Sequence, residues 1–321
     1  MNSVILYIGQ DITSHLILNR VVPSLIAEGV RPVVCLTGAS ILDQGLSKPL
    51  EKVAFYERVL TNKHVYPLLN VLPYFKQPCY TPQQIAKIYN LKLYPSIANI
   101  NAEEVYHELF TGKSNVIGAV SISCLQIFKP QMIERIREHG FLLNLHPGLL
   151  PETRGLYAPF WAMARGDDAY GVTLHHINAG IDTGRILRAH KKVLNKAQSY
   201  LENRMELASG AARLITQAIE RHLGGDRLVG RSQKHMTGAT YYTTPTLKEL
   251  NAFQAEGLQL TASPRRMAER YLSIFKPEDA EASRLLEERL VSAIRAFETG
   301  ARERSVTAGA VKPLDALNGA G

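Results

Sequence analysis

The chain has 321 residues, of which 45% are hydrophobic, and its formal net charge is +8. This length and composition suit an α/β core with a smaller second unit and exclude a mostly disordered chain. The sequence shows no apolar run near 18 residues and no secretory leader, so we expect a cytoplasmic protein without a membrane span. The basic balance fits nucleic acid or anionic small substrates equally well.

The first 80 residues open as a strand, a helix and a second strand. These elements are expected at Ser3–Gly9, Ser14–Glu28 and Pro32–Thr37. The turn after the first strand reads GQDITS, so the GxGxxG dinucleotide fingerprint is absent, and no GxxxxGK[ST] motif occurs. Prolines interrupt residues 38 to 80, where we expect an irregular segment with one helix near Leu50–Leu60.

The middle of the chain continues this alternation. Helices are predicted to begin at Thr81 and Asn101, which stand at N-cap positions before Pro82 and before an acidic first turn. A strand over Ser114–Ile122 and a helix over Gln126–His139 follow.

The last third reads as mainly helical. We expect one long amphipathic helix over Leu201–Leu223 and a short extended segment, GATYYTTPT, over Gly238–Thr246. Three more helices are expected over Thr246–Glu256, Ser263–Phe275 and Pro277–Phe297. The predicted organisation is a catalytic domain over residues 1–230 and a small, mainly helical C-terminal region over residues 231–300. A disordered tail is expected over residues 301–321.

Polar side chains occur where an apolar run ends at NLHPGLLPETRG. Asn144 and His146 lie two residues apart, so a strand would point both to one face, and Pro147 with Gly148 would end that strand. Ligands bind at the carboxyl ends of strands in open α/β sheets. Asp182 follows 38 residues after Asn144, a distance that allows a loop, a helix and a strand to bring the carboxylate beside the imidazole.

These three groups suit acyl chemistry. An amide and a protonated imidazole can donate to the oxygen of a tetrahedral intermediate, and a carboxylate can orient the imidazole and raise its pKa. No serine or cysteine nucleophile is placed with them, which favours direct transfer between two substrates. The three cysteines are odd in number and far apart, so we expect buried free thiols and no metal site.

The segments NLHPGLLPETRG and GVTLHHINAGIDTG resemble the two signature blocks of the formyltetrahydrofolate-dependent formyltransferases. This family includes glycinamide ribonucleotide, methionyl-tRNA and sugar N-formyltransferases. The motif HPGLLP, with Gly148 where many relatives have serine, is most similar to that of the nucleotide-sugar branch. The resemblance implies a Rossmann-like open twisted sheet and places the catalytic asparagine, histidine and aspartate of the family at Asn144, His146 and Asp182.

The resemblance also implies binding residues. The co-substrate 10-formyltetrahydrofolate is expected to contact the turn before the helix at Gln126–His139 and the loop that carries Asp182, at Ser121, Cys124, Leu125, Ile127, Phe128, Gly180 and Ile181. The acceptor is expected near Arg154, Gly155 and Trp161, although an ion pair for Arg154 and core packing for Trp161 are the plainer interpretations. Of His175 and His176, one should face inward, and we interpret it as structural.

The predicted function is therefore transfer of a formyl group from 10-formyltetrahydrofolate to a primary amine, of a nucleotide-linked amino sugar in the first instance. Two alternatives stay open, a methionyl-tRNA formyltransferase and a formyltetrahydrofolate hydrolase. The last third is predicted to be helical, whereas a methionyl-tRNA formyltransferase is expected to have a β-barrel there. This difference favours the amino sugar over the tRNA as acceptor. The expected partners are small-molecule substrates, without membrane and without a nucleic-acid partner, and a homodimer is left open.

Overall fold

A mostly parallel seven-stranded sheet forms the centre of the computed structural model, which describes residues 1–38, 45–112 and 115–300. The strand order is β3-β2-β1-β4-β5-β7-β8, and the pairs from β3 to β5 are parallel, whereas β7 is antiparallel to β5 and β8 to β7. This sheet confirms the predicted α/β class. The strands are β1 (Asn2–Ile8), β2 (Val30–Thr37), β3 (Leu93–Ile97), β4 (Asn115–Ile122), β5 (Phe141–His146), β7 (Ala169–His176) and β8 (Ile186–Val193).

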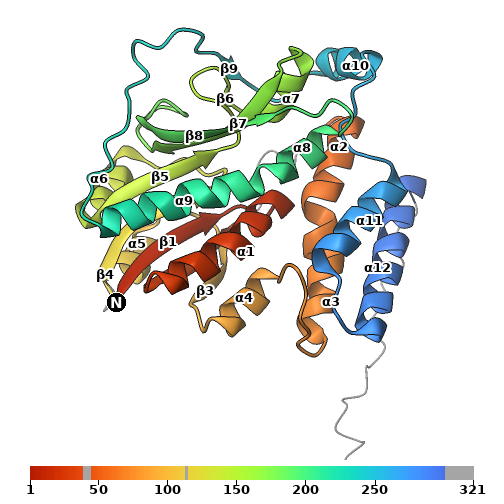
Figure 1. Ribbon diagram of the computed structural model, residues 1–321, viewed down its shortest axis with the longest axis horizontal. Coiled ribbons are helices and arrows are strands. Elements are labelled where there is room, and N and C mark those ends of the chain that lie inside the picture. The colour runs from red at the N-terminus through yellow and green to blue at the C-terminus, as the bar shows by residue number, and fades with distance from the viewer. Residues whose placement is uncertain (39–44, 113–114, 301–321) are drawn as a thin grey trace, which may run out of the picture.

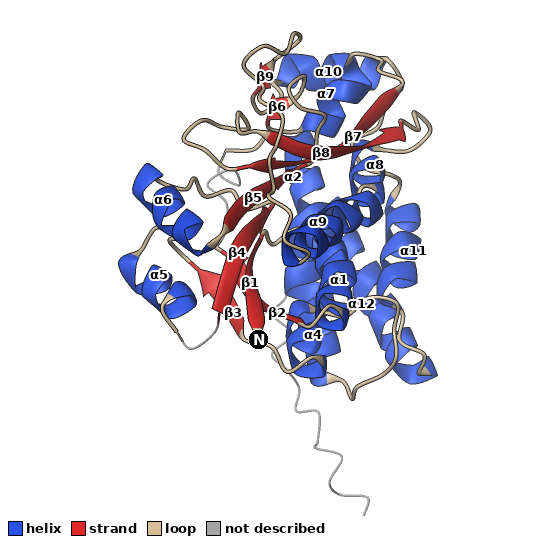
Figure 2. Cartoon of the chain, turned by 60° about the vertical axis from the view of Figure 1, so that its left-hand side comes forward, coloured by secondary structure: helices blue, strands red, loops and turns tan. Residues whose placement is uncertain are grey.

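Helices cover both faces of the sheet (Figures 1 and 2). Helices α1 (Ile12–Ala27) and α9 (Ala208–Leu223) lie on one face, and α5 (Glu103–Phe110) and α6 (Pro130–His139) lie on the other. Alternate side chains of the buried strands point to opposite faces, so β1 contributes to both apolar cores. Val4, Leu6 and Ile8 pack into the core beneath α1 and α9, and Ile5 and Tyr7 pack into the core beneath α5 and α6.

A group of helices lies beside the sheet (Figure 1). One run of chain comprises α2 (Lys48–Ala54), the π-helix η2 (Phe55–Val65) and α3 (Tyr66–Val71). It packs against α11 (Pro264–Phe275) and α12 (Ala280–Thr299), as shown by the stacked rings of Phe55 and Phe297 at 4.0 Å. Residues of these helices belong to the same apolar core as α1 and α9.

Shorter elements complete the described chain. They are α4 (Pro82–Ile88), β6 (Arg154–Gly155), α7 (Ala158–Ala164), α8 (Tyr200–Glu206), β9 (Tyr241–Tyr242) and α10 (Leu247–Ala255). The Thr81 hydroxyl and the Gln84 side chain form the capping box at the start of α4, as the N-cap signal predicts. Strands β6 and β9 pair in parallel as a separate two-stranded sheet.

Three regions differ from the sequence prediction. The segment expected to be irregular, with one helix near Leu50–Leu60, is helical from Lys48 to Val71 as α2, η2 and α3. The helix expected over Leu201–Leu223 is divided at Leu207 into α8 and α9, and α8 has its own capping box at Ser199 and Glu202. Strand β3 was not predicted, because it contains Pro95 and most of its residues are not buried, so no alternating apolar pattern marks it. The tail predicted for residues 301–321 lies outside the described residues. Within the described ranges, no helix is both long and apolar enough to cross a membrane.

Candidate active site

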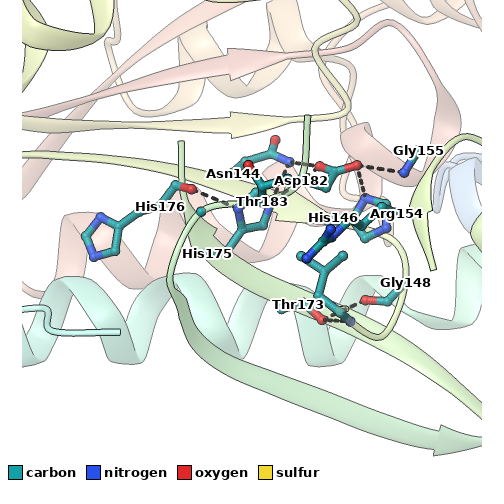
Figure 3. A network of polar contacts seen from close by, with 12 residues as sticks. Asn144, His146, Gly148, Arg154, Gly155, Thr173, His175, His176, Asp182 and Thr183 are labelled. Atoms are coloured by element: carbon teal, nitrogen blue, oxygen red, sulfur yellow. Dashed lines mark hydrogen bonds and ion pairs between the residues drawn. The ribbon is translucent and has the colours of Figure 1, made fainter. Parts of the chain in front are cut away.

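Asn144, His146 and Asp182 come together where β5 ends (Figure 3). Asn144 and His146 stand on β5, and Asp182 lies in the loop between β7 and β8. The Nδ2 atom of Asn144 lies 3.5 Å from Asp182 Oδ1, and Nδ1 of His146 lies 3.3 Å from Asp182 Oδ2. One carboxylate therefore contacts both the amide and the imidazole, as the spacing along the chain predicts.

The loop that carries Asp182 has a constrained backbone. Asp182 has a left-handed conformation, with φ of 52°, which is uncommon for a residue other than glycine. Two residues later, a side chain in place of Gly184 would put a Cβ atom 1.7 Å from the carbonyl oxygen of His176. The backbone N–H of Gly155 donates to Asp182 Oδ2 at 2.9 Å. The carboxylate is thus directed at Asn144 and His146 by its own turn and by strand β6.

The Asn144 amide has partners for both of its N–H groups. Its Nδ2 atom lies 3.1 Å from Nε2 of His175, which stands opposite Asn144 on strand β7. With Nδ1 of His175 donating to the carbonyl of His176 at 2.8 Å, Nε2 is assigned as the acceptor of a hydrogen from Asn144. The second Asn144 hydrogen faces Asp182 across the longer 3.5 Å contact. This weaker contact leaves that hydrogen available to a substrate oxygen.

His146 is buried, with 3% of its surface exposed, and both of its ring nitrogens face oxygen atoms. Nδ1 faces Asp182, and Nε2 lies 2.5 Å from the carbonyl oxygen of Thr153. Burial lowers the pKa of His146 below its usual value, although Asp182 and the Thr153 carbonyl raise it. Asp182 thus raises the pKa of this imidazole as predicted, but desolvation of the charged ring outweighs the carboxylate.

Asp182 stays ionised. Burial raises the pKa of its carboxyl group, but the nearby rings of His146 and His175 and the Gly155 N–H lower it to about 2. At neutral pH the site therefore holds a carboxylate beside an imidazole whose pKa is lowered by burial. A proton that enters this pair during a reaction is stabilised on His146 by the adjacent negative charge.

The residues predicted to contact the folate lie on strand β4 and on two loops at this end of the sheet. Ser121 is buried on β4 directly beside Asn144, and Phe128 is buried with its ring edge against Tyr7. Cys124 is partly buried and packs on the same apolar core as Ile177 of the facing loop. Three apolar side chains are exposed, Leu125 and Ile127 on one loop and Ile181 on the other, next to exposed Gly180.

The residues predicted to contact the acceptor have partners within the chain. Arg154 donates from Nη2 to Oε1 of Gln233 at 2.8 Å, and the Gly155 N–H binds Asp182. The Trp161 ring stacks on Tyr242 at 4.8 Å, and its Nε1–H faces the carbonyl of Thr243 at 3.3 Å. An acceptor contact for Arg154 and Trp161 stays a prediction.

Two residues of the site were not predicted. His175 had been interpreted as structural, but it contacts both Asn144 and Asp182. Its alternation with His176 on one strand was the available signal. Gln233 donates to the carbonyl oxygens of Asp182 and Gly184, and no sequence pattern marks it, because it lies in an irregular segment 51 residues after Asp182.

Fold and site together define an α/β protein with an amide, two imidazoles and a carboxylate at the edge of a mostly parallel sheet. Among the residues that the structure describes, no group of three or more His, Cys, Asp or Glu side chains is arranged to hold a metal ion. Residues 82–215 match the family model described as Formyl transferase, and they include Asn144, His146, His175 and Asp182. Over this segment the chain is similar to the formyl transferase family.

The curated relatives are methionyl-tRNA formyltransferases. The protein of Burkholderia multivorans is 32% identical over 120 residues, which cover 37% of this chain and 36% of the relative. The protein of Carboxydothermus hydrogenoformans is 34% identical over 119 residues, which cover 37% of each chain. The match thus spans little more than a third of these relatives.

Solved structures give more extended but weaker matches. A sugar N-formyltransferase from a Shewanella species is 15% identical, with a TM-score of 0.48, over 90% of this chain and 87% of that one.

Proposed function

We propose that the chain transfers a formyl group from 10-formyltetrahydrofolate to a primary amine by direct attack of the amine on the formyl carbon. The observation that carries this proposal is the contact of both Asn144 and His146 with Asp182 at the carboxyl end of β5. The groups in contact there are hydrogen-bond donors and one carboxylate, which suit stabilisation of charge and movement of a proton.

Asn144 is proposed to stabilise the tetrahedral intermediate. One N–H is fixed on Nε2 of His175, which orients the amide, and the other is held only by the longer contact with Asp182. A developing oxyanion is a stronger acceptor for that second hydrogen than a carboxylate at 3.5 Å. The gain therefore arises in the transition state, where it accelerates the reaction.

His146 is proposed to give the second hydrogen bond and to share a proton with Asp182. Its Nε2–H must first leave the Thr153 carbonyl, so the substrate oxygen replaces that carbonyl as the acceptor. The attacking amine loses one proton as the C–N bond forms, and the bond from the formyl carbon to the folate nitrogen then breaks. The folate nitrogen regains a proton, so the enzyme ends as it began.

The folate is proposed to bind between the loop at 123–128 and the loop that carries Asp182. The exposed side chains of Leu125, Ile127 and Ile181 offer apolar surface on both loops. Such surface is suited to an aromatic ring, because covering it removes apolar area from water. Cys124 and Ile177, which belong to these two loops, both pack against the apolar core beneath α5 and α6.

The acceptor is proposed to be a nucleotide-linked amino sugar. Residues 247–299, where a tRNA formyltransferase is expected to have a β-barrel, contain helices α10, α11 and α12. The motif HPGLLP, which resembles that of the sugar branch, begins with His146. The named curated relatives act on methionyl-tRNA, so that acceptor is the second candidate.

Mass spectrometry of the products tests this function. Purified protein is incubated with 10-formyltetrahydrofolate and either a panel of nucleotide-linked amino sugars, charged initiator tRNA or no acceptor. We expect a formylated amino sugar and an equal amount of tetrahydrofolate. Formylated tRNA with no sugar product would transfer the proposal to the second candidate, and formate without an acceptor would identify a hydrolase.

A further inference from the structure

Gln233 lies against the turn that carries Asp182, although it is outside the segment that matches the family model. Its Nε2 group donates to the carbonyl oxygens of Asp182 at 2.9 Å and of Gly184 at 2.7 Å. The side chain is buried, with 5% of its surface exposed. Two carbonyls of a left-handed turn therefore obtain their hydrogen bonds from one side-chain amide.

The orientation of the Gln233 amide is unambiguous. Arg154 donates to its Oε1 atom from Nε at 3.2 Å and from Nη2 at 2.8 Å. A guanidinium is only a donor, so the amide oxygen must face Arg154. The NH₂ group must then face the two carbonyls of the turn.

The same connection reaches the carboxylate of Asp182. Arg154 precedes Gly155, whose backbone N–H donates to Asp182 Oδ2 at 2.9 Å. Gln233 thus donates to the Asp182 backbone and also binds Arg154, the residue before the Gly155 N–H that binds the Asp182 side chain.

The segment around Gln233 is itself fastened at both ends. Arg231 exchanges two backbone hydrogen bonds with Ile186 on β8, and Tyr241 and Tyr242 pair with β6. In Figure 1 this segment leaves the end of α9 and crosses to β9 over the region of β8. The amide is thereby brought to the turn on a tethered backbone, which allows it to fix the position of Asp182.

We propose that Gln233 is a positioning residue, which holds Asp182 in register with His146 and Asn144. The inference rests on the proposed function only for its kinetic readout. Loss of the two hydrogen bonds lets the turn relax, and the carboxylate then moves away from the imidazole. A misplacement of about 1 Å in such a site can lower the rate by up to 10²-fold.

The test compares Gln233→Met and Gln233→Glu with wild type and with Gln217→Met as a matched control. Methionine has a similar length but offers no amide. Glutamate keeps an oxygen for Arg154 and loses the donors, so it serves if the methionine variant is poorly folded. Gln217 lies on α9 and contacts Arg188 through a long 3.4 Å hydrogen bond. The measurements are kcat, both KM values, Tm and the titration of the His146 ring by NMR.

We expect both Gln233 variants to lower kcat by about tenfold or more, with both KM values within twofold of wild type. In Gln233→Met the pKa of His146 should fall, because the carboxylate that raises it has moved. Folded Gln233 variants with wild-type kcat and an unchanged His146 titration would overturn the inference. Inactive wild type would instead refute the proposed function, and the NMR titration would still decide the role of Gln233.

Discussion

His175 determines how far Asn144 can act, because its ring accepts one of the two amide hydrogens. Without that acceptor the amide rotates more freely and is less often directed at the substrate. We expect His175→Leu to lower kcat by roughly tenfold, since an oriented donor is replaced by a mobile one. His175→Gln offers an oxygen as acceptor and should recover part of the rate. Equal rates for both variants and wild type would exclude the orienting role.

The charge state of His146 gives a prediction on pH. Burial lowers the pKa of His146, so its NMR titration should have a midpoint below the usual value of about 6.5. Asp182 acts in the opposite direction and raises this pKa, so Asp182→Asn should move the midpoint lower still. Asn178→Asp, on an exposed position of the same loop, is the control. A midpoint above 6.5 in wild type would mean that the carboxylate outweighs burial.

At the scale of elements, Arg204 of α8 connects α1 and η2. Its guanidinium lies 3.3 Å from Asp11 and also pairs with Glu57, and both carboxylate side chains are at most 4% exposed. Arg58 also pairs with Glu57, at 2.6 Å, so two cations face the two buried carboxylates. The π-helix thereby contacts the N-terminus of α1 near the end of strand β1, beside the sheet edge that carries the site.

Removal of Arg204 should destabilise the fold strongly. Arg204→Met leaves Asp11 with only its hydrogen bonds from Ser14 and leaves Glu57 with Arg58 as its remaining cation. Because both carboxylates are buried, we expect a loss of about 3–5 kcal/mol in the free energy of unfolding, measured in urea. Arg221→Met breaks an ion pair with Asp226 in which both side chains are more than half exposed, and should cost less than about 1 kcal/mol. Similar losses of unfolding free energy in the two variants would show that the buried ion pairs of Arg204 stabilise the fold no more than an exposed ion pair does.

The sequence predicted the alternation of strands and helices and the meeting of Asn144, His146 and Asp182. Both rest on local patterns, the apolar runs and a spacing that fits one loop, helix and strand. The contacts of His175 and Gln233 depend on the β5–β7 register and on where a long irregular segment crosses the sheet, which no local pattern records. The sequence predicted that Asp182 raises the pKa of His146, but not the larger lowering by burial, because burial is a property of the folded chain.

At the scale of the whole molecule, the net charge of +8 is relevant to the acceptor. A tRNA would be held by many phosphate contacts, so log(kcat/KM) would fall steeply with log[salt], by about 0.9 for each neutralised phosphate of a duplex. A nucleotide-linked sugar has only a diphosphate, and we expect a slope of about 2 or less. Steady-state assays at several salt concentrations measure this slope, and a value of 5 or more would favour tRNA.

The central claim is that the Asn144 amide stabilises the transition state of formyl transfer to an amine. The most direct test is the single-turnover rate constant for transfer of labelled formyl from saturating 10-formyltetrahydrofolate, compared between wild type and Asn144→Ala. We predict a rate constant at least about 10²-fold lower in the variant, with the folate Kd changed little, because one preorganised donor is lost. A variant that transfers formyl at the wild-type rate would contradict the account.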